Sequence, residues 1–144
     1  WGILVLFGGG LALAKGMSVS GIVDLVAQAI ASSEISILFT AILLIFLMLF
    51  MTELMSNVAL VAVLAPVVAG IAIGLDIPIL YLLIPVTMAS SCAFMLPMAT
   101  PPNAIVFASG YIKVHEMARI GVILNLVAVA LLSVMFQFVV PLLF

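Results

Sequence analysis

A long apolar run that is interrupted by three closely spaced prolines constrains the fold of this chain more than any other feature. No charged residue occurs between Ile77 and Ile112, a stretch long enough to cross a lipid bilayer once. Pro97, Pro101 and Pro102 lie within it, and none has the N–H group that a helix donates to the carbonyl four residues earlier. Backbone N–H and C=O groups without hydrogen-bond partners cost too much free energy in contact with lipid. The interruption therefore has to lie beside protein or a watery cavity. The run therefore predicts a discontinuous transmembrane helix.

The residues around the prolines indicate where the two halves of this helix lie. Thr100 is a good N-cap, and Pro101 suits the first helical position after it. We expect a first half over Ile79–Met98, a break at residues 97–103 and a second half over Ala104–Tyr111. Transporters use such breaks to bind ions and substrates, because open carbonyls end one half and a positive dipole begins the other. The alternative is a proline-kinked helix that binds nothing.

The composition excludes several classes of protein. Of the 144 residues, 69% are hydrophobic and only 6% are charged, so no soluble domain of this length could cover the apolar surface. Three Lys and Arg residues make no basic patch, and no nucleic-acid partner is expected. One His and one Cys are too few for a metal cluster and do not favour an enzyme. We therefore expect an integral membrane protein without covalent chemistry.

Charge and turn signals divide the chain into four predicted parts. In order, these are a membrane helix with an interfacial amphipathic helix (residues 1–34), a helical hairpin with its tip at 52–58 (35–75), the discontinuous helix (76–112), and a connection with the last transmembrane helix (113–144). The connection over Lys113–Arg119 carries two of the three cations, so the positive-inside rule places it in the cytoplasm. The last helix is expected over Gly121–Phe144. Because the chain starts at Trp1 inside an apolar helix pattern, we expect a fragment of a longer protein.

The polar residues between the two hairpin helices permit two interpretations. Glu53, Ser56 and Asn57 suit the aqueous turn of an ordinary helical hairpin. They equally suit a tip that lies deep in the protein and faces the broken helix, with Ser56 or Asn57 capping the second arm. Two helix N-termini, at Asn57 and Thr100, would then converge on one negatively charged ligand. The pattern alone leaves both interpretations open.

Glu53 also permits two interpretations. An ionisable residue within a membrane segment is a functional hypothesis by default. The side chain suits a structural role as well, as a solvated or paired carboxylate in a water-filled vestibule. We favour the structural role, because a site for anions gains nothing from a nearby carboxylate.

Three stretches of this sequence resemble a known family. The S-N-V of Ser56–Val58 is similar to the Ser-Asn-Thr signature of the divalent anion/sodium symporters, the sodium-dependent di- and tricarboxylate transporters. The sequence M-L-P-M-A-T-P-P-N-A-I-V-F-A-S-G, at Met95–Gly110, resembles the second motif of that family nearly letter for letter. The opening W-G-I-L-V-L-F-G-G-G-L-A-L-A resembles the helix that precedes its outward hairpin. The resemblance covers essentially the whole chain and implies the C-terminal half of such a symporter.

The resemblance implies a fold and a set of site residues. The fold is an all-α transmembrane helix bundle, with a re-entrant helical hairpin and a discontinuous helix as one of two inverted repeats. Sodium would be bound by oxygens, mostly backbone carbonyls, of Thr52, Met55, Asn57 and Ala99. The substrate would be bound by Ser56, Asn57, Val58, Thr100 and Pro101. Val58 departs from the family pattern, which has Thr at this position, so a hydroxyl donor is missing and the substrate is less certain than the sodium coupling.

The function that the resemblance implies is sodium-coupled symport of di- or tricarboxylates of the succinate, malate and citrate class by alternating access. The implied partners are a small anionic substrate, the sodium ion, the lipid bilayer, the N-terminal half of the same transporter and a second copy in a homodimer. The implied location is a bacterial inner membrane, as a multi-pass protein. Two alternatives remain: a sodium-coupled transporter of an inorganic divalent anion such as sulfate, and a pore-forming or structural membrane subunit.

Overall fold

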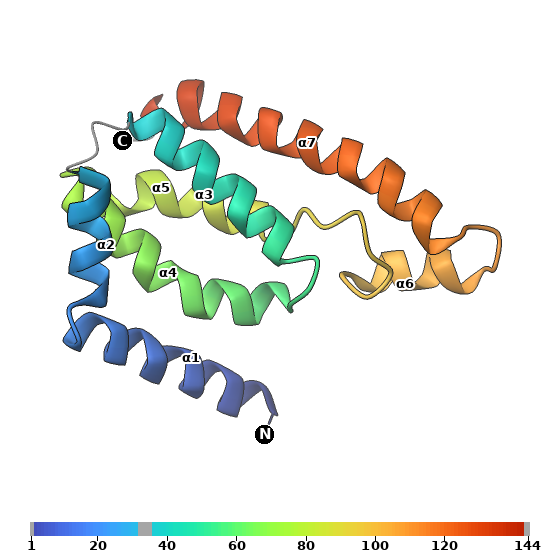
Figure 1. Cartoon of the computed structure of the whole chain (residues 1–144), viewed down its shortest axis with the longest axis horizontal. Helices are drawn as coiled ribbons and strands as arrows, with labels where there is room; N and C mark the ends of the chain where they lie inside the picture. The colour runs from blue at the N-terminus through green and yellow to red at the C-terminus, as the bar shows by residue number, and fades with distance from the viewer. Residues whose placement is uncertain (1, 32–35, 143–144) are drawn as a thin grey trace.

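The computed structural model describes residues 2–31 and 36–142, and this part of the chain is helical without any strand (Figure 1). Its elements are α1 (Gly2–Val19), α2 (Ile22–Ala31), α3 (Ile37–Met51), α4 (Asn57–Gly74), α5 (Ile79–Ala89), α6 (Pro101–Ala108), α7 (Val114–Phe138) and a 3-10 turn, η1 (Val140–Leu142). The all-α prediction is therefore confirmed. The predicted boundary between residues 34 and 35 lies outside the described residues.

Four helices form the core of the molecule. The hairpin helix α3 packs against α5 and α7, while its second arm, α4, packs against α5. Buried aliphatic side chains fill the space between them, among them Ile45, Leu49, Leu60 and Leu82. Figure 1 shows α7 running along α3 and reaching beyond it to α6, which lies at the far end of the molecule. The segment between α5 and α6 therefore passes the hairpin tip.

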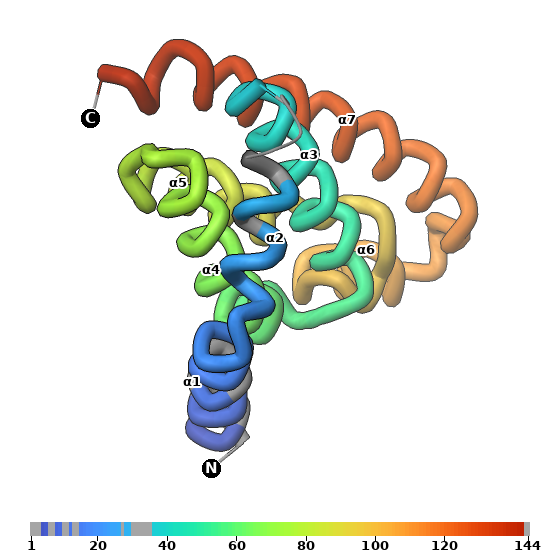
Figure 2. Tube along the Cα trace, turned by 60° about the vertical axis from the view of Figure 1, so that its left-hand side comes forward, coloured from blue at the N-terminus to red at the C-terminus, as the bar shows by residue number. Residues whose placement is uncertain are grey.

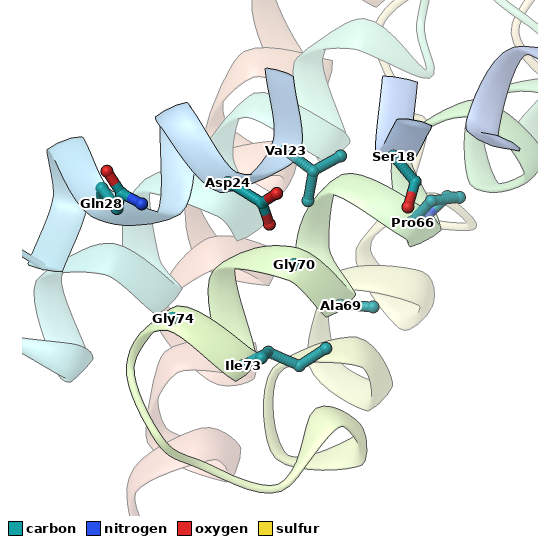
Figure 3. Close-up of a pocket in the computed structure, with 9 residues that line it drawn as sticks. All are labelled: Ser18, Val23, Asp24, Gln28, Pro66, Ala69, Gly70, Ile73 and Gly74. Atoms are coloured by element: carbon teal, nitrogen blue, oxygen red, sulfur yellow. The ribbon is translucent and has the colours of Figure 1, made fainter. Parts of the chain in front are cut away.

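The first two helices pack on the outer side of α4 (Figure 2), and Figure 1 shows them at a steep angle to each other. Gly21 makes the turn between them with φ +75°, a conformation that side chains rarely adopt. One turn of α2 fits closely onto α4, because a Cβ at Gly70 would lie 1.7 Å from Cγ1 of Val23. Beside this contact is a cavity of about 460 Å³, with Asp24 and Gln28 at its edge (Figure 3). The glycine therefore sets the distance between α2 and the hairpin.

Two of the described helices are long and apolar enough to cross a membrane. They are Asn57–Gly74, and Val114 through the final turn to Leu142. The apolar helices α3 and α5 are shorter, with 15 and 11 residues. At 1.5 Å per residue these two span roughly 22 Å and 16 Å, less than the roughly 30 Å hydrocarbon core of a bilayer. Neither crosses a membrane alone.

The predicted extent of the discontinuous helix is wrong in its first half. Helix α5 ends at Ala89 rather than at Met98, so the break covers residues 90–100 instead of 97–103. The second half begins earlier than expected as well, at Pro101, with Thr100 as its N-cap in agreement with the cap prediction. It ends at Ala108 rather than at Tyr111, because Gly110 turns the chain with φ +75°.

The predicted connection over residues 113–119 is also corrected, because most of it is helical. Helix α7 begins at Val114, seven residues before the expected start at Gly121. The Glu116 carboxylate accepts a hydrogen bond of 2.9 Å from the N–H of Lys113, which begins the helix there. The charged residues of this stretch remain exposed, as expected of a surface segment.

Candidate functional site

The hairpin tip joins α3 to α4 through five residues, 52–56. Thr52 is the C-cap of α3, and Ser56 is the N-cap position of α4, as predicted for the start of the second arm. The side chains of Thr52 and Glu53 are 0% and 3% exposed, whereas Leu54, Met55 and Ser56 are exposed. An aqueous turn would leave its carboxylate in water. The burial of Glu53 therefore favours a tip that faces protein.

Three oxygens from the two ends of the tip and from α5 lie together. The Thr52 hydroxyl is 2.7 Å from the side-chain oxygen of Asn57 and 2.7 Å from the carbonyl oxygen of Ser90. A hydroxyl has only one proton, so it can donate to only one of these acceptors at a time. The cluster connects the tip to the end of α5. It also supplies the oxygen ligands that a hard cation prefers.

Glu53 holds the interrupted segment by its backbone. One carboxylate oxygen accepts hydrogen bonds of 2.8 and 2.9 Å from the N–H groups of Phe94 and Met95, and the other accepts one of 3.0 Å from that of Leu96. Three consecutive N–H groups that point at one carboxylate cannot also bond to the carbonyls one turn earlier. This explains why no helix continues through residues 94–96, where the sequence predicted one. It also confirms the structural role favoured for Glu53, with backbone donors in place of the predicted watery vestibule.

Asn103 satisfies the carbonyls of the same segment. Its side-chain amide donates to the carbonyl oxygens of Ala93, at 3.0 Å, and of Leu96, at 3.1 Å. Ala93 lies four residues before Pro97, so its carbonyl is one that the proline leaves without a helical donor. The break is thus stable because a carboxylate accepts from its N–H groups and an amide donates to its carbonyls.

The N-terminus of helix α6 has a weak N-cap. The Thr100 hydroxyl accepts from the N–H of Asn103 at 3.5 Å, a long contact for a cap. Pro101 and Pro102 have no N–H groups, so the first two helical positions offer the dipole of the helix but no donor. At the start of α4, by contrast, the Ser56 hydroxyl makes no capping bond, and the first N–H groups keep their capacity to donate.

Both helix starts open into one cavity of about 440 Å³. Its lining residues come from the hairpin tip and from the end of the break: Leu54, Met55, Ser56, Asn57, Val58, Met98, Ala99, Thr100 and Pro101. All five residues predicted to bind the substrate are in this lining, as are Met55 and Ala99 of the predicted sodium ligands. Thr52 is not, because it lies buried behind Asn57 and touches its side-chain oxygen.

The chemistry of this cavity suits binding rather than catalysis. Its described lining has no charged side chain, and Glu53, directed at the loop N–H groups, is not part of it. Hydroxyl, amide and backbone N–H donors face the cavity together with two helix N-termini, which favour a bound anion. Carbonyl and amide oxygens nearby suit a small hard cation.

Comparison with known proteins agrees with this arrangement. The profile of the family described as "Sodium:sulfate symporter transmembrane region" matches residues 1–144. The chain belongs to this symporter family. Membership places it among membrane transporters rather than enzymes, as the sequence predicted, and confirms the resemblance seen in its motifs.

Two relatives share the name "Sodium-dependent dicarboxylate transporter SdcS". The one from Staphylococcus saprophyticus is 40% identical over 142 residues, and the one from Staphylococcus aureus (strain USA300) is 39% identical over the same length. Each alignment covers 98% of this chain but only 27% of the relative. The chain therefore spans about a quarter of the length of these transporters.

Sequence reasoning missed several residues that shape the candidate site. The carbonyl of Ser90 joins the oxygen cluster only because α5 ends early. Asn103 and Asn125 are both tied to the broken segment, through its carbonyls and through Glu53 respectively. The sequence does contain one signal for them, which is an asparagine within an apolar helix. A buried side-chain amide is almost always hydrogen-bonded, so such a residue indicates a polar partner. That signal does not say which partner it has.

Proposed function

We propose that this chain is part of a sodium-coupled symporter for dicarboxylates or tricarboxylates. The observation that supports it most is the single cavity lined by both the Ser-Asn tip and the Thr100–Pro101 helix start. Two helix N-termini and the donors of Ser56, Asn57 and Thr100 would bind a carboxylate group there. The names of the two staphylococcal relatives point to the same substrate class.

Sodium, as the co-transported ion, would bind to oxygens at the tip. Asn57 belongs to the substrate cavity and contacts Thr52, so one side chain connects the two ligands. We propose Thr52, Met55, Asn57 and Ala99 as the ligands, and the short distance to the Ser90 carbonyl adds a fifth candidate oxygen. Because Asn57 serves both sites, sodium and substrate should each raise the affinity for the other by the same factor.

The hairpin α3–α4 would be re-entrant. The length of α3, too short to span a bilayer, and the burial of Thr52 and Glu53 both support a tip within the membrane. In this proposal the chain is the C-terminal repeat of a multi-pass protein in a bacterial inner membrane. It would work with an inverted N-terminal repeat and as a homodimer, exposing the site to each side in turn.

The proposal is tested by uptake into proteoliposomes that contain the full-length carrier. An inward sodium gradient should concentrate labelled succinate, malate or citrate above its outside level, and replacing sodium by potassium should abolish the accumulation. Equilibration without accumulation would instead indicate a pore. Accumulation of sulfate but of no carboxylate would support transport of an inorganic divalent anion instead. The description of the family mentions sulfate, so this alternative is part of the test.

A further inference from the structure

Helix α7 carries a buried asparagine that contacts the carboxylate of the hairpin tip. Asn125 is 0% exposed, and its amide nitrogen donates to Glu53 at 2.8 Å. Its side-chain oxygen has no hydrogen-bond partner among the residues that the structure describes. A buried acceptor without a donor costs stability, so an apolar residue would pack better at this position. The bond to Glu53 is the one interaction in the described residues that accounts for this asparagine.

A glycine one turn before it lets the interrupted segment lie directly on α7. A Cβ added at Gly121 would come 2.4 Å from the Cα of Met95 and 2.5 Å from the carbonyl oxygen of Phe94. Both contacts are with backbone, which cannot swing aside as a side chain does. Gly121 and Asn125 lie on one face of the helix, because they are four residues apart. Together they form a seat for residues 94–96.

We propose that Gly121 and Asn125 are positioning residues for the sodium and substrate site. Asn125 fixes the Glu53 carboxylate, which fixes the N–H groups of residues 94–96, and Gly121 fixes how close that loop lies to α7. Asn103 also binds the loop, and it belongs to the helix that Thr100 begins. The place of Ala99 and Thr100 at the cavity thus depends on α7, although neither Gly121 nor Asn125 lines it.

This inference rests on the proposed function, and its test separates positioning from a merely structural role. Asn125→Leu keeps the branching of the side chain at Cγ, with a larger volume, and removes the donor. In the full-length carrier in proteoliposomes, we expect the KM for the dicarboxylate and the half-saturating sodium concentration to rise together by about threefold to tenfold. The amount of inserted carrier should stay within twofold of wild type. The control is Ser133→Ala on the same helix, whose hydroxyl bonds, among the residues that the structure describes, only to the carbonyl of Val129.

A lower amount of inserted carrier with unchanged KM and sodium dependence would overturn the proposal, because it would show that Asn125 serves packing alone. Gly121→Ala should raise both constants more than Asn125→Leu does. Its control is Gly16→Ala, where a Cβ would meet nothing within 4 Å. If the Gly121→Ala carrier does not insert into the membrane, the KM and sodium dependence of Asn125→Leu still test the proposal.

Hydrogen exchange gives a readout that does not depend on transport. The amides of Phe94, Met95 and Leu96 should exchange several-fold faster in Asn125→Leu than in wild type, with no change in the hairpin arms. Equal exchange rates in the two proteins would contradict the proposal that Asn125 holds residues 94–96 in place. If the wild-type carrier moves no carboxylate, the proposed function fails, yet this exchange experiment still tests whether α7 positions the loop.

Discussion

The hairpin tip and the interrupted segment face each other across one cavity, but they satisfy their backbones in different ways. The tip, residues 52–56, is closed mainly by neighbours: the N–H of Leu54 donates to the carbonyl of Met51, and Thr52 contacts Asn57. In the segment of residues 90–100 the two ends are also closed by neighbouring carbonyls. Its middle, residues 93–96, depends on side chains from elsewhere, because Glu53 accepts from its N–H groups and Asn103 donates to its carbonyls. The tip is therefore closed mostly by bonds between nearby residues, whereas the middle of the interrupted segment needs side chains from other parts of the fold.

This difference predicts two kinds of variant. Changes at the tip should alter ligand binding while the protein still folds, since few distant contacts depend on the exposed tip residues. Changes at the groups that hold the interrupted segment should reduce folded protein as well, because they leave buried backbone groups without partners.

The largest effect is expected from Glu53→Ala. Three part-buried loop N–H groups and the buried amide of Asn125 lose their acceptor. A fully buried donor left open costs about 1–3 kcal/mol, which is an upper value for each loop N–H group. Even a part of this sum is a large fraction of the roughly 5–15 kcal/mol that stabilises a typical folded domain. The full-length carrier should fail to give a monodisperse peak on size-exclusion chromatography in mild detergent. Asp24→Ala removes an exposed carboxylate on α2 and is the control. Wild-type yield and thermal stability for Glu53→Ala would mean that the loop does not need its carboxylate.

A smaller loss is expected from Asn103→Asp, which keeps the shape of the side chain but cannot donate while it is charged. The carbonyls of Ala93 and Leu96 lose their donor and face a carboxylate, so the apparent melting temperature of the carrier should fall. The cost is about 1–3 kcal/mol for each unpaired carbonyl before the loop relaxes. Ser109→Ala, at the exposed end of the same helix, should leave the melting temperature unchanged. Equal melting of Asn103→Asp and wild type would show that these carbonyls find other donors.

The smallest effect is expected at the tip, from Val58→Thr. This change is nearly isosteric and adds one hydroxyl to a side chain that is 48% exposed and lines the cavity. A neutral hydrogen bond contributes about 0.5–1.5 kcal/mol, so the KM for the best-fitting carboxylate should fall by at most about tenfold. Val61→Thr, one turn further along α4 and outside this cavity, is the matched control. If both variants leave the KM of every substrate unchanged, residue 58 does not face the ligand.

The same contrast explains which features the sequence could predict. Thr100 with Pro101, and Ser56 with Asn57, mark helix starts through local chemistry, and the structure has both starts at those residues. The break was predicted too short because the group that holds residues 94–96 out of a helix, Glu53, lies 41 residues away from Phe94 in the chain. Proline signals show that a helix cannot continue, but they do not show which distant side chain accepts the freed N–H groups.

The seat on α7 was invisible for a related reason. In the sequence, Gly121 looks like any small residue in an apolar helix. The structure shows why no side chain fits there, because a Cβ would lie too close to the backbone of Met95. The charged residues predict a connection over residues 113–119, whereas α7 already begins at Val114. In the structure, Glu116 instead bonds to the Lys113 N–H and begins the helix.

Asn57 tests the central claim most directly, because it belongs to the cavity and to the oxygen cluster with Thr52. The measurement is initial uptake by the full-length carrier across a sodium titration, normalised to inserted protein, for Asn57→Ala beside Thr100→Ala. We predict that Asn57→Ala raises both the half-saturating sodium concentration and the KM for the carboxylate. Thr100→Ala should raise the KM alone, with a cap loss of about 0.5–2 kcal/mol in stability. Normal sodium dependence together with normal carboxylate affinity in Asn57→Ala would contradict the account.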